Sequence, residues 1–148
     1  MFTPKRILVP TDFSSFSDKA LKRAVEIAEE KGATIYLLHV IDKQVQQCAA
    51  DYCIDAEIVK QMERDAKKKS KELLAKQASS ATAGKNVEVV YDVQMGYPSE
   101  VIVEEQKKKR IDLIVIASHG KTGLKKLLLG SVAERVVRGA KCSVIVVK

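Results

Sequence analysis

Apolar residues form two alternating patterns along this chain: short unbroken runs, and longer stretches with helical spacing. Five runs rich in branched apolar residues predict strands at residues 7–9, 34–40, 87–93, 111–117 and 143–147. Four stretches with apolar residues three and four positions apart predict helices at residues 17–31, 55–78, 98–109 and 131–138. Strands and helices therefore alternate from one end of the chain to the other.

Local signals predict where these elements begin and end. Pro10 is expected to end the first strand, Ser17 to cap the first helix and Gly32 to stop it. Pro98 suits the first position of a helix. The helix at 55–78 is expected to bury one apolar side made of Ile58, Met62, Ala66, Leu73 and Leu74.

The alternation predicts an α/β fold in which a parallel sheet is covered by helices on both faces. Right-handed crossovers favour a doubly wound five-stranded sheet in the order 3-2-1-4-5, with residues 1–148 as a single domain. Ligands of such sheets bind beyond the carboxyl ends of the strands, where the strand order reverses. Here that point lies between the first and fourth strands.

Two polar segments should meet at this point. One is Pro10-Thr11-Asp12, and the other runs through Ala117-Ser118-His119-Gly120 and, after nine residues, Gly130-Ser131 at the start of a helix. Glycines allow a charged ligand to approach the backbone, and a helix start offers free N–H groups and the positive end of its dipole. Lys121, Lys125 and Lys126 add positive charge. The two segments together predict a phosphate site.

Composition narrows the functional classes. No run of 18 apolar residues predicts a membrane span, and the first residues do not resemble a signal peptide, so a cytoplasmic protein is expected. The three cysteines do not suggest a disulfide framework: Cys142 is expected in the core, and no histidine near Cys48 and Cys53 completes a zinc set.

The net charge of +7 raises the question of nucleic-acid binding. Much of the excess lies in helical patterns, where acidic residues are interleaved with the lysines, and this arrangement is typical of solvated helix faces. Aromatic residues make up 5% of the chain, so surfaces for stacking bases are scarce. Nucleic-acid binding is therefore disfavoured.

Several motifs together resemble the universal stress protein family over essentially the whole chain. They are Ile7-Leu8-Val9-Pro10-Thr11-Asp12-Phe13-Ser14, Leu37-Leu38-His39-Val40, Gly96-Tyr97-Pro98, Ser118-His119-Gly120-Lys121-Thr122-Gly123-Leu124 and Leu127-Leu128-Leu129-Gly130-Ser131-Val132-Ala133. Members of this family that bind ATP carry Gly, two residues, Gly, nine residues, Gly, then Ser or Thr. Gly120, Gly130 and Ser131 match that pattern, whereas Ala117 replaces its first glycine.

The resemblance implies roles for individual residues. Asp12 would hydrogen-bond the adenosine part, and the backbone of Val40 would contact adenine. The ribose and the phosphates would lie against the segment that contains Ala117, His119, Gly120, Gly130, Ser131 and Val132, with Pro10 and Thr11 beside them. Magnesium would be held mainly through phosphate oxygens and water. A homodimer through Ser143–Val147 is also implied.

Other interpretations stay open at this point. Asp12 could be only a turn residue, and His39 a buried structural histidine. If Ala117 is extended, alanine fits there; a positive φ would make it unfavourable. A regulatory ATP-binding switch is the leading hypothesis. The alternatives are a slow ATPase or phosphotransferase, for which His119 is the local candidate base, and a structural dimer that binds no nucleotide. A P-loop kinase is disfavoured, because its glycine–lysine spacing is absent.

Overall fold

The computed structural model describes residues 1–44, 47, 51–52, 54–121 and 129–148. Five parallel strands form one sheet in the order β3-β2-β1-β4-β5, as predicted. The elements are β1 (Arg6–Pro10), α1 (Ser15–Lys31), β2 (Thr34–Asp42), α3 (Ala56–Ala81), β3 (Val89–Gly96), α4 (Pro98–Lys108), β4 (Leu113–Ala117), α5 (Ser131–Gly139) and β5 (Ser143–Val147).

The strand order reverses beside β1, which occupies the middle of the sheet. Ile7 pairs with Ile35 of β2 on one side and with Leu113 of β4 on the other. Because β2 follows β1 on one side and β4 lies on the other, the connections after β1 and β4 diverge and leave a crevice between them. The expected switch point is therefore present.

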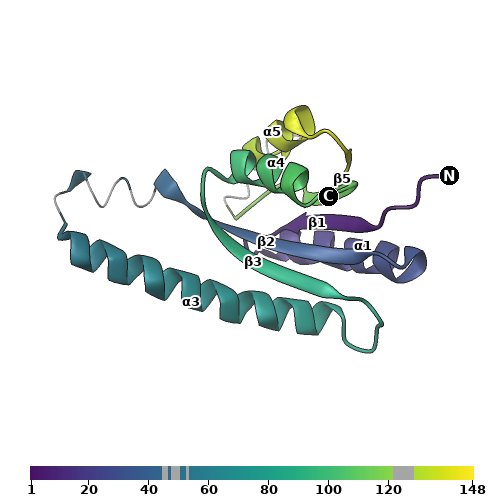
Figure 1. Cartoon of the computed structure of the whole chain (residues 1–148), viewed down its shortest axis with the longest axis horizontal. Coiled ribbons are helices and arrows are strands. Elements are labelled where there is room, and N and C mark those ends of the chain that lie inside the picture. The colour runs from purple at the N-terminus through teal and green to yellow at the C-terminus, as the bar shows by residue number, and fades with distance from the viewer. Residues whose placement is uncertain (45–46, 48–50, 53, 122–128) are drawn as a thin grey trace.

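Helices cover both faces of the sheet (Figure 1). One face packs against α1 and α3 through residues such as Leu21, Val25 and Leu74. The other face packs against α4 and α5 through Ile102 and Val136. The central strands are buried on both sides, which explains their continuous apolar runs. None of the described helices is both long and apolar enough to cross a bilayer.

The first helix begins earlier than predicted. Its N-cap is Ser14, whose side chain accepts a hydrogen bond from the Ser17 N–H, and Ser17 lies inside the helix. Ser17 is buried, and its hydroxyl donates to Ser14 O at 2.8 Å. Several serines stand in this segment, and propensity alone does not choose among them as caps.

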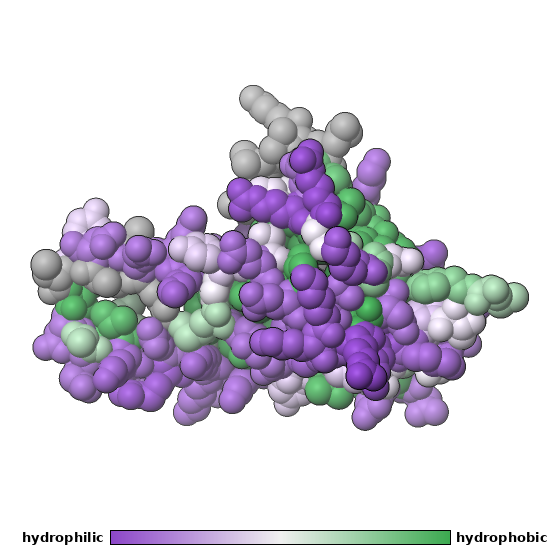
Figure 2. Space-filling model, turned by 45° about the horizontal axis from the view of Figure 1, so that its top comes forward, coloured by the Kyte–Doolittle hydropathy of each residue, from purple (hydrophilic) through white to green (hydrophobic). Residues whose placement is uncertain are grey.

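The predicted buried side of α3 is partly wrong. Ser70, Leu74 and Ala78 are the buried residues of this helix, whereas Ile58 and Met62 are more than half exposed and Leu73 is also exposed. The N-terminal part of α3 extends past the sheet (Figure 1), and hydrophobic residues reach the surface at this projecting end (Figure 2). Helical periodicity identifies an apolar stripe but does not show where the sheet beneath it ends.

Two strands extend further than predicted. β2 continues past Val40 to Asp42, and β3 spans residues 89–96 instead of 87–93, since the two strands stay paired as far as Asp42 and Gly96. This extension brings Asp42 to the rim of the crevice. Residues 42–53 fit no strand or helix pattern in the sequence; Asp42 belongs to β2, and residues 45–46, 48–50 and 53 lie outside the described residues.

Candidate functional site

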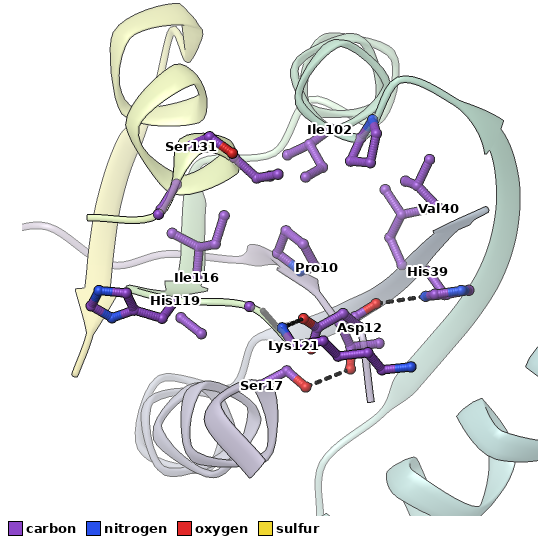
Figure 3. A pocket seen from close by; sticks show the side chains of 18 of the residues that line it. Pro10, Asp12, Ser17, His39, Val40, Ile102, Ile116, His119, Lys121 and Ser131 are labelled. Atoms are coloured by element: carbon purple, nitrogen blue, oxygen red, sulfur yellow. Dashed lines mark hydrogen bonds between the residues drawn. The ribbon is translucent and has the colours of Figure 1, made fainter. Parts of the chain in front are cut away.

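A cleft of about 410 Å³ opens at the carboxyl ends of β1, β2 and β4. Figure 3 shows side chains from β1, β2, β4, α4 and α5 around it. Every residue predicted for the site lines this cleft: Pro10, Thr11, Asp12, Val40, Ala117, His119, Gly120, Gly130, Ser131 and Val132. The structure thus brings together three segments that are distant in sequence.

Asp12 joins the two loops that flank the switch point. Its Oδ1 accepts a hydrogen bond from the Ser14 N–H at 3.0 Å, and its Oδ2 accepts one from the Lys121 N–H at 2.7 Å. Burial raises the pKa of Asp12, but the hydrogen bonds from Ser14 and Lys121 outweigh burial, so this pKa lies below its ordinary value. Asp12 is therefore a carboxylate at neutral pH, and it is more than a local turn residue.

Glycine is needed at position 120 for this contact. A Cβ on Gly120 would lie 2.8 Å from Asp12 Oδ2, closer than a carbon and an oxygen can approach. Any side chain there would push the carboxylate away from the Lys121 N–H.

Gly130 packs against the loop that follows β4. Its N–H donates to Ser118 O at 2.6 Å, and an added Cβ would lie 3.2 Å from that same oxygen. This glycine is the N-cap of α5, and no side chain there accepts a hydrogen bond from the first N–H groups of the helix. The start of α5 therefore presents free backbone donors beside Ser131 at the cleft, an arrangement that suits an anion.

Ala117 replaces the first glycine of the pattern without backbone strain. It is the last residue of β4, and among the described residues only Phe13 and Arg110 combine a side chain with a positive φ. Ala117 is 8% exposed and belongs to the apolar cluster on the α1 face of the sheet. Because strand residues alternate between faces, its methyl group lies against α1, while Ile116 faces the α4 side.

The backbone of Val40 faces the cleft. Leu38 O accepts a hydrogen bond from the Thr11 N–H at 2.8 Å, and Leu38 is opposite Pro10, the last residue of β1. The backbone N–H and C=O groups of every second strand residue point toward the same neighbouring strand. The N–H and C=O groups of Val40 therefore point to the β1 side, as those of Leu38 do, but beyond the end of β1.

His39 is a lining residue that the sequence prediction left out. Its Nδ1–H donates to Thr11 O at 2.7 Å, and its ring packs on Phe13 with 4.4 Å between ring centroids. Burial lowers the pKa of His39, and the nearby positive charge of Lys121 adds to this effect against the opposing hydrogen bond to Thr11. His39 is therefore a neutral, hydrogen-bonded structural histidine.

Thr11 anchors the loop after β1 to α1 and α3. Its hydroxyl oxygen lies 3.0 Å from Ser17 Oγ and 2.9 Å from Gln77 Oε1, and it accepts from the Phe13 N–H at 3.1 Å. The amide of Gln77 in turn donates to Asp18 at 2.7 Å. This network fixes the wall of the cleft that carries Asp12.

Part of the cleft wall is apolar, and of its residues the sequence prediction includes Val40 but not Ile102 or Ile116. In Figure 3, Ile102 and Val40 lie across the cleft from Asp12 and Lys121, whereas Ile116 lies near Ser131. The remaining lining residues that were not predicted are Ser17, Leu38, Asp42, Pro98, Ser118 and Ala133. Helix α4 supplies part of this wall, and no polar motif in the sequence marks such apolar residues.

His119 lies beside the start of the loop. Its Nδ1 is 2.9 Å from Ser118 Oγ, and its ring centroid is 6.2 Å from that of Phe16. Ser118 is buried, so the hydrogen bond between its hydroxyl and the His119 ring fixes the orientation of that ring. Lys125, Lys126, Cys48 and Cys53 lie outside the described residues. Within the described ranges, no group of three or more His, Cys, Asp or Glu side chains is placed to hold a metal ion.

The sequence as a whole was compared with known proteins. A family model described as "Universal stress protein family" matches residues 3–148. The chain belongs to the universal stress protein family. Universal stress protein MJ0531 of Methanocaldococcus jannaschii is 37% identical over 147 residues, which cover 97% of this chain and 82% of that protein.

Solved structures of family members share the fold. Protein MJ0577, a universal stress protein of the same organism, is 31% identical to this chain and superimposes with a TM-score of 0.86 over 99% of this chain and 97% of its own. A universal stress protein solved in complex with cAMP superimposes with a TM-score of 0.70 at 23% identity, covering 99% and 98% of the two chains. At 23% identity, this comparison shows that the two proteins share a fold and nothing more.

Proposed function

We infer that this universal stress protein binds ATP in the cleft between the loops after β1 and β4 and acts as a nucleotide-dependent regulator in the stress response. The observation that carries the inference is the meeting of Asp12, Gly120 and the uncapped start of α5 around one cavity. The apolar end of the cavity suits a base, and the end with backbone donors suits phosphates.

The ligand class follows from these two ends. A nucleotide has an aromatic base and an anionic tail, and the cleft offers an apolar wall and helix-start donors for them. Ser131, the first residue of α5, adds a hydroxyl donor, and Lys121 adds a positive charge. Magnesium would be held by the phosphates and water, and it would neutralise charge on the triphosphate. The complex of a family member with cAMP supports an adenine nucleotide as the ligand.

Ser131→Ala tests the site more cleanly than a change at Gly130. A valine at position 130 would meet Ser118 O and disturb the loop whether or not a nucleotide binds there. Ser131 is exposed, so removing its hydroxyl group should leave folding intact. Losing a hydrogen bond to a charged phosphate should weaken ATP binding about 10- to 100-fold.

Isothermal titration calorimetry with ATP and magnesium measures this effect. Ser80→Ala is the matched control, because Ser80 is exposed near the end of α3, outside the cleft. Equal ATP affinity in the Ser131→Ala and wild-type proteins would place the phosphates elsewhere. No binding of ATP to the wild-type protein would reject the proposal.

We propose that the protein acts by binding the nucleotide and does not hydrolyse it efficiently. The cleft supplies binding groups, and Asp12 is already engaged by two backbone N–H groups. A bound nucleotide can act as a signal if it favours one state of the protein over another. We expect ATP turnover below about 1 s⁻¹, the lower end of kinase rates. Faster turnover that is lost in His119→Ala would instead identify an ATPase or phosphotransferase.

A second candidate is a family member that binds no nucleotide and works as a dimer. The packing of Gly130 against Ser118 favours it, because the glycine has a structural reason to be there. Mass spectrometry of small molecules released from the purified, denatured protein separates the two candidates. Recovery of an adenine nucleotide supports the first candidate, and its absence together with no binding in calorimetry supports the second.

A further inference from the structure

The N-terminal half of α3 contributes no buried residue to the described core. The buried residues of this helix are Ser70, Leu74 and Ala78, all in its C-terminal half. Figure 1 shows the N-terminal half extending past the sheet. Most helical stability in proteins comes from packing an apolar face, and this half has such a face without a sheet beneath it. We propose that two copies of this chain pack their α3 helices against each other in antiparallel orientation.

The proposed contact surface is a stripe along the outer face of α3. Spacings of three and four residues place its members on one side of the helix. They are all exposed: Ile58, Met62, Asp65, Lys69, Leu73 and Lys76. Ile58 and Met62 are each more than half exposed. The buried residues of the helix lie on a different side, so this stripe faces away from the sheet.

The charges at the middle of the stripe are complementary in an antiparallel pair. Asp65 and Lys69 lie about one helical turn apart. A two-fold axis midway between their levels therefore places Asp65 of each copy opposite Lys69 of the other. The same axis brings Met62 to the level of Leu73 in the second copy, to within about 1.5 Å of helix rise. A parallel pair would instead place like charges opposite each other.

Both charged groups can form these contacts. The Asp65 carboxylate accepts one hydrogen bond, from the Gln61 side-chain amide to Oδ1 at 2.8 Å, within its own helix. Neither Asp65 nor Lys69 forms an ion pair with another described residue. Charge pairs of this kind determine orientation and register, and the apolar side chains of the stripe supply the area removed from water.

A second copy fits this stripe better than an acidic peptide or an anionic membrane surface, because the stripe carries both signs of charge. The contact uses neither the nucleotide cleft nor β5. It is therefore independent of the proposed function, and it would join dimers formed through β5 into larger assemblies. The apolar part of the stripe is short, so the contact is expected to be weak.

Sedimentation equilibrium of the full chain without nucleotide tests the proposal. The average mass of the wild-type protein should rise between tens and hundreds of micromolar. Met62→Lys should remove this rise, because it places a charge in the apolar part of the stripe. Val90→Lys is the matched control, since Val90 is an exposed apolar residue of β3, and it should keep the rise. A constant wild-type mass over this range, or a rise unchanged in Met62→Lys, would overturn the proposal and leave the stripe to a partner of another kind.

Exchange of the two charges tests the antiparallel register. Asp65→Lys places lysines opposite each other, and Lys69→Asp places aspartates opposite each other. Each change turns two attractive pairs into repulsive ones and should raise the dissociation constant of the α3 contact about tenfold. An equimolar mixture of the two variants should recover the association, because lysine then faces aspartate at both positions.

Circular dichroism should show wild-type helix content in both charge variants, because both positions are exposed. Recovery in the mixture cannot come from a defect in folding, and it requires contact between two copies. Self-association of either variant alone at the wild-type level, or no recovery in the mixture, would overturn the proposal.

Discussion

The backbone N–H of Lys121 donates to Asp12 Oδ2 at 2.7 Å, across 109 positions of sequence. This hydrogen bond connects the loop after β1 with the loop after β4. The opposite edge of the carboxylate accepts from the Ser14 N–H, so one side chain determines the shape of both loops.

Asp12→Asn should therefore destabilise the fold as well as the cleft. An asparagine has one acceptor oxygen, so its amide group must face one of the two N–H donors. We expect a loss of about 1–3 kcal/mol in the free energy of unfolding, measured by urea denaturation. Asp65→Asn, an exposed change on α3, should stay within about 0.5 kcal/mol of wild type. Equal effects of the two changes would contradict the bridging role of Asp12.

Ala117→Gly restores the glycine of the ATP-binding pattern, and it should not improve binding. The backbone at Ala117 is extended and its methyl group packs toward α1, so alanine does not obstruct the cleft. Calorimetry should show ATP affinity within about threefold of wild type, while urea denaturation without nucleotide shows a loss of about 1–2 kcal/mol from the missing methyl and the freer backbone. A tenfold gain in affinity would show that the methyl group hinders the ligand.

His39 should contribute to the acid sensitivity of the protein. Burial holds the pKa of His39 in the folded protein below the unfolded value of about 6.5. The folded state then binds fewer protons, so this stabilisation is present above about pH 6.5 and is lost as the pH falls through the folded pKa. The chain has two histidines, so NMR can follow both ring signals separately.

His39→Asn checks this prediction, because an amide can still donate to Thr11 O. The fall in melting temperature between pH 7 and pH 5 should be smaller in His39→Asn than in wild type, and His119→Asn serves as the control. A His39 signal that titrates at or above pH 6.5 would contradict the prediction.

Ile145→Lys should weaken the homodimer that we propose through β5. This strand is an edge of the sheet, and such edges favour pairing or cover. Ile145 is exposed, whereas Val146 packs against the cluster on the α4 side, so a lysine at position 146 would disturb the core.

Val90→Lys is the control at the opposite edge, because Val90 is an exposed branched residue of β3. Light scattering at tens of micromolar should show a dimer for wild type and Val90→Lys, and a dissociation constant raised about tenfold or more for Ile145→Lys. A wild-type monomer at that concentration would rule out the dimer.

Local patterns predict much of this fold for a physical reason. Buried parallel strands need continuous apolar runs, and crossover connections restrict the order in which such strands can pair. The polar loops at the switch point follow from that order, so the sequence alone is enough to group Asp12 with Gly120 and Ser131.

The rest depends on contacts that sequence patterns do not record. The choice of Ser14 over Ser17 as the N-cap of α1 depends on the local geometry of the chain after β1. The inclusion of Asp42 and Ile102 in the cleft depends on how far β2 extends and where α4 packs. Apolar walls carry no motif, and strand ends are set by the partner strand.

The central position of β1 has a consequence for how the protein is made. Ile7 pairs with Ile35 early in the chain, but its other neighbour, Leu113, is synthesised 106 residues later (113 − 7). Closing so long a loop slows folding, because its entropy must be lost before the strands pair. The ends of the cleft come from residues near 12, 40 and 130, so a growing chain on the ribosome has no complete cleft until α5 has been synthesised.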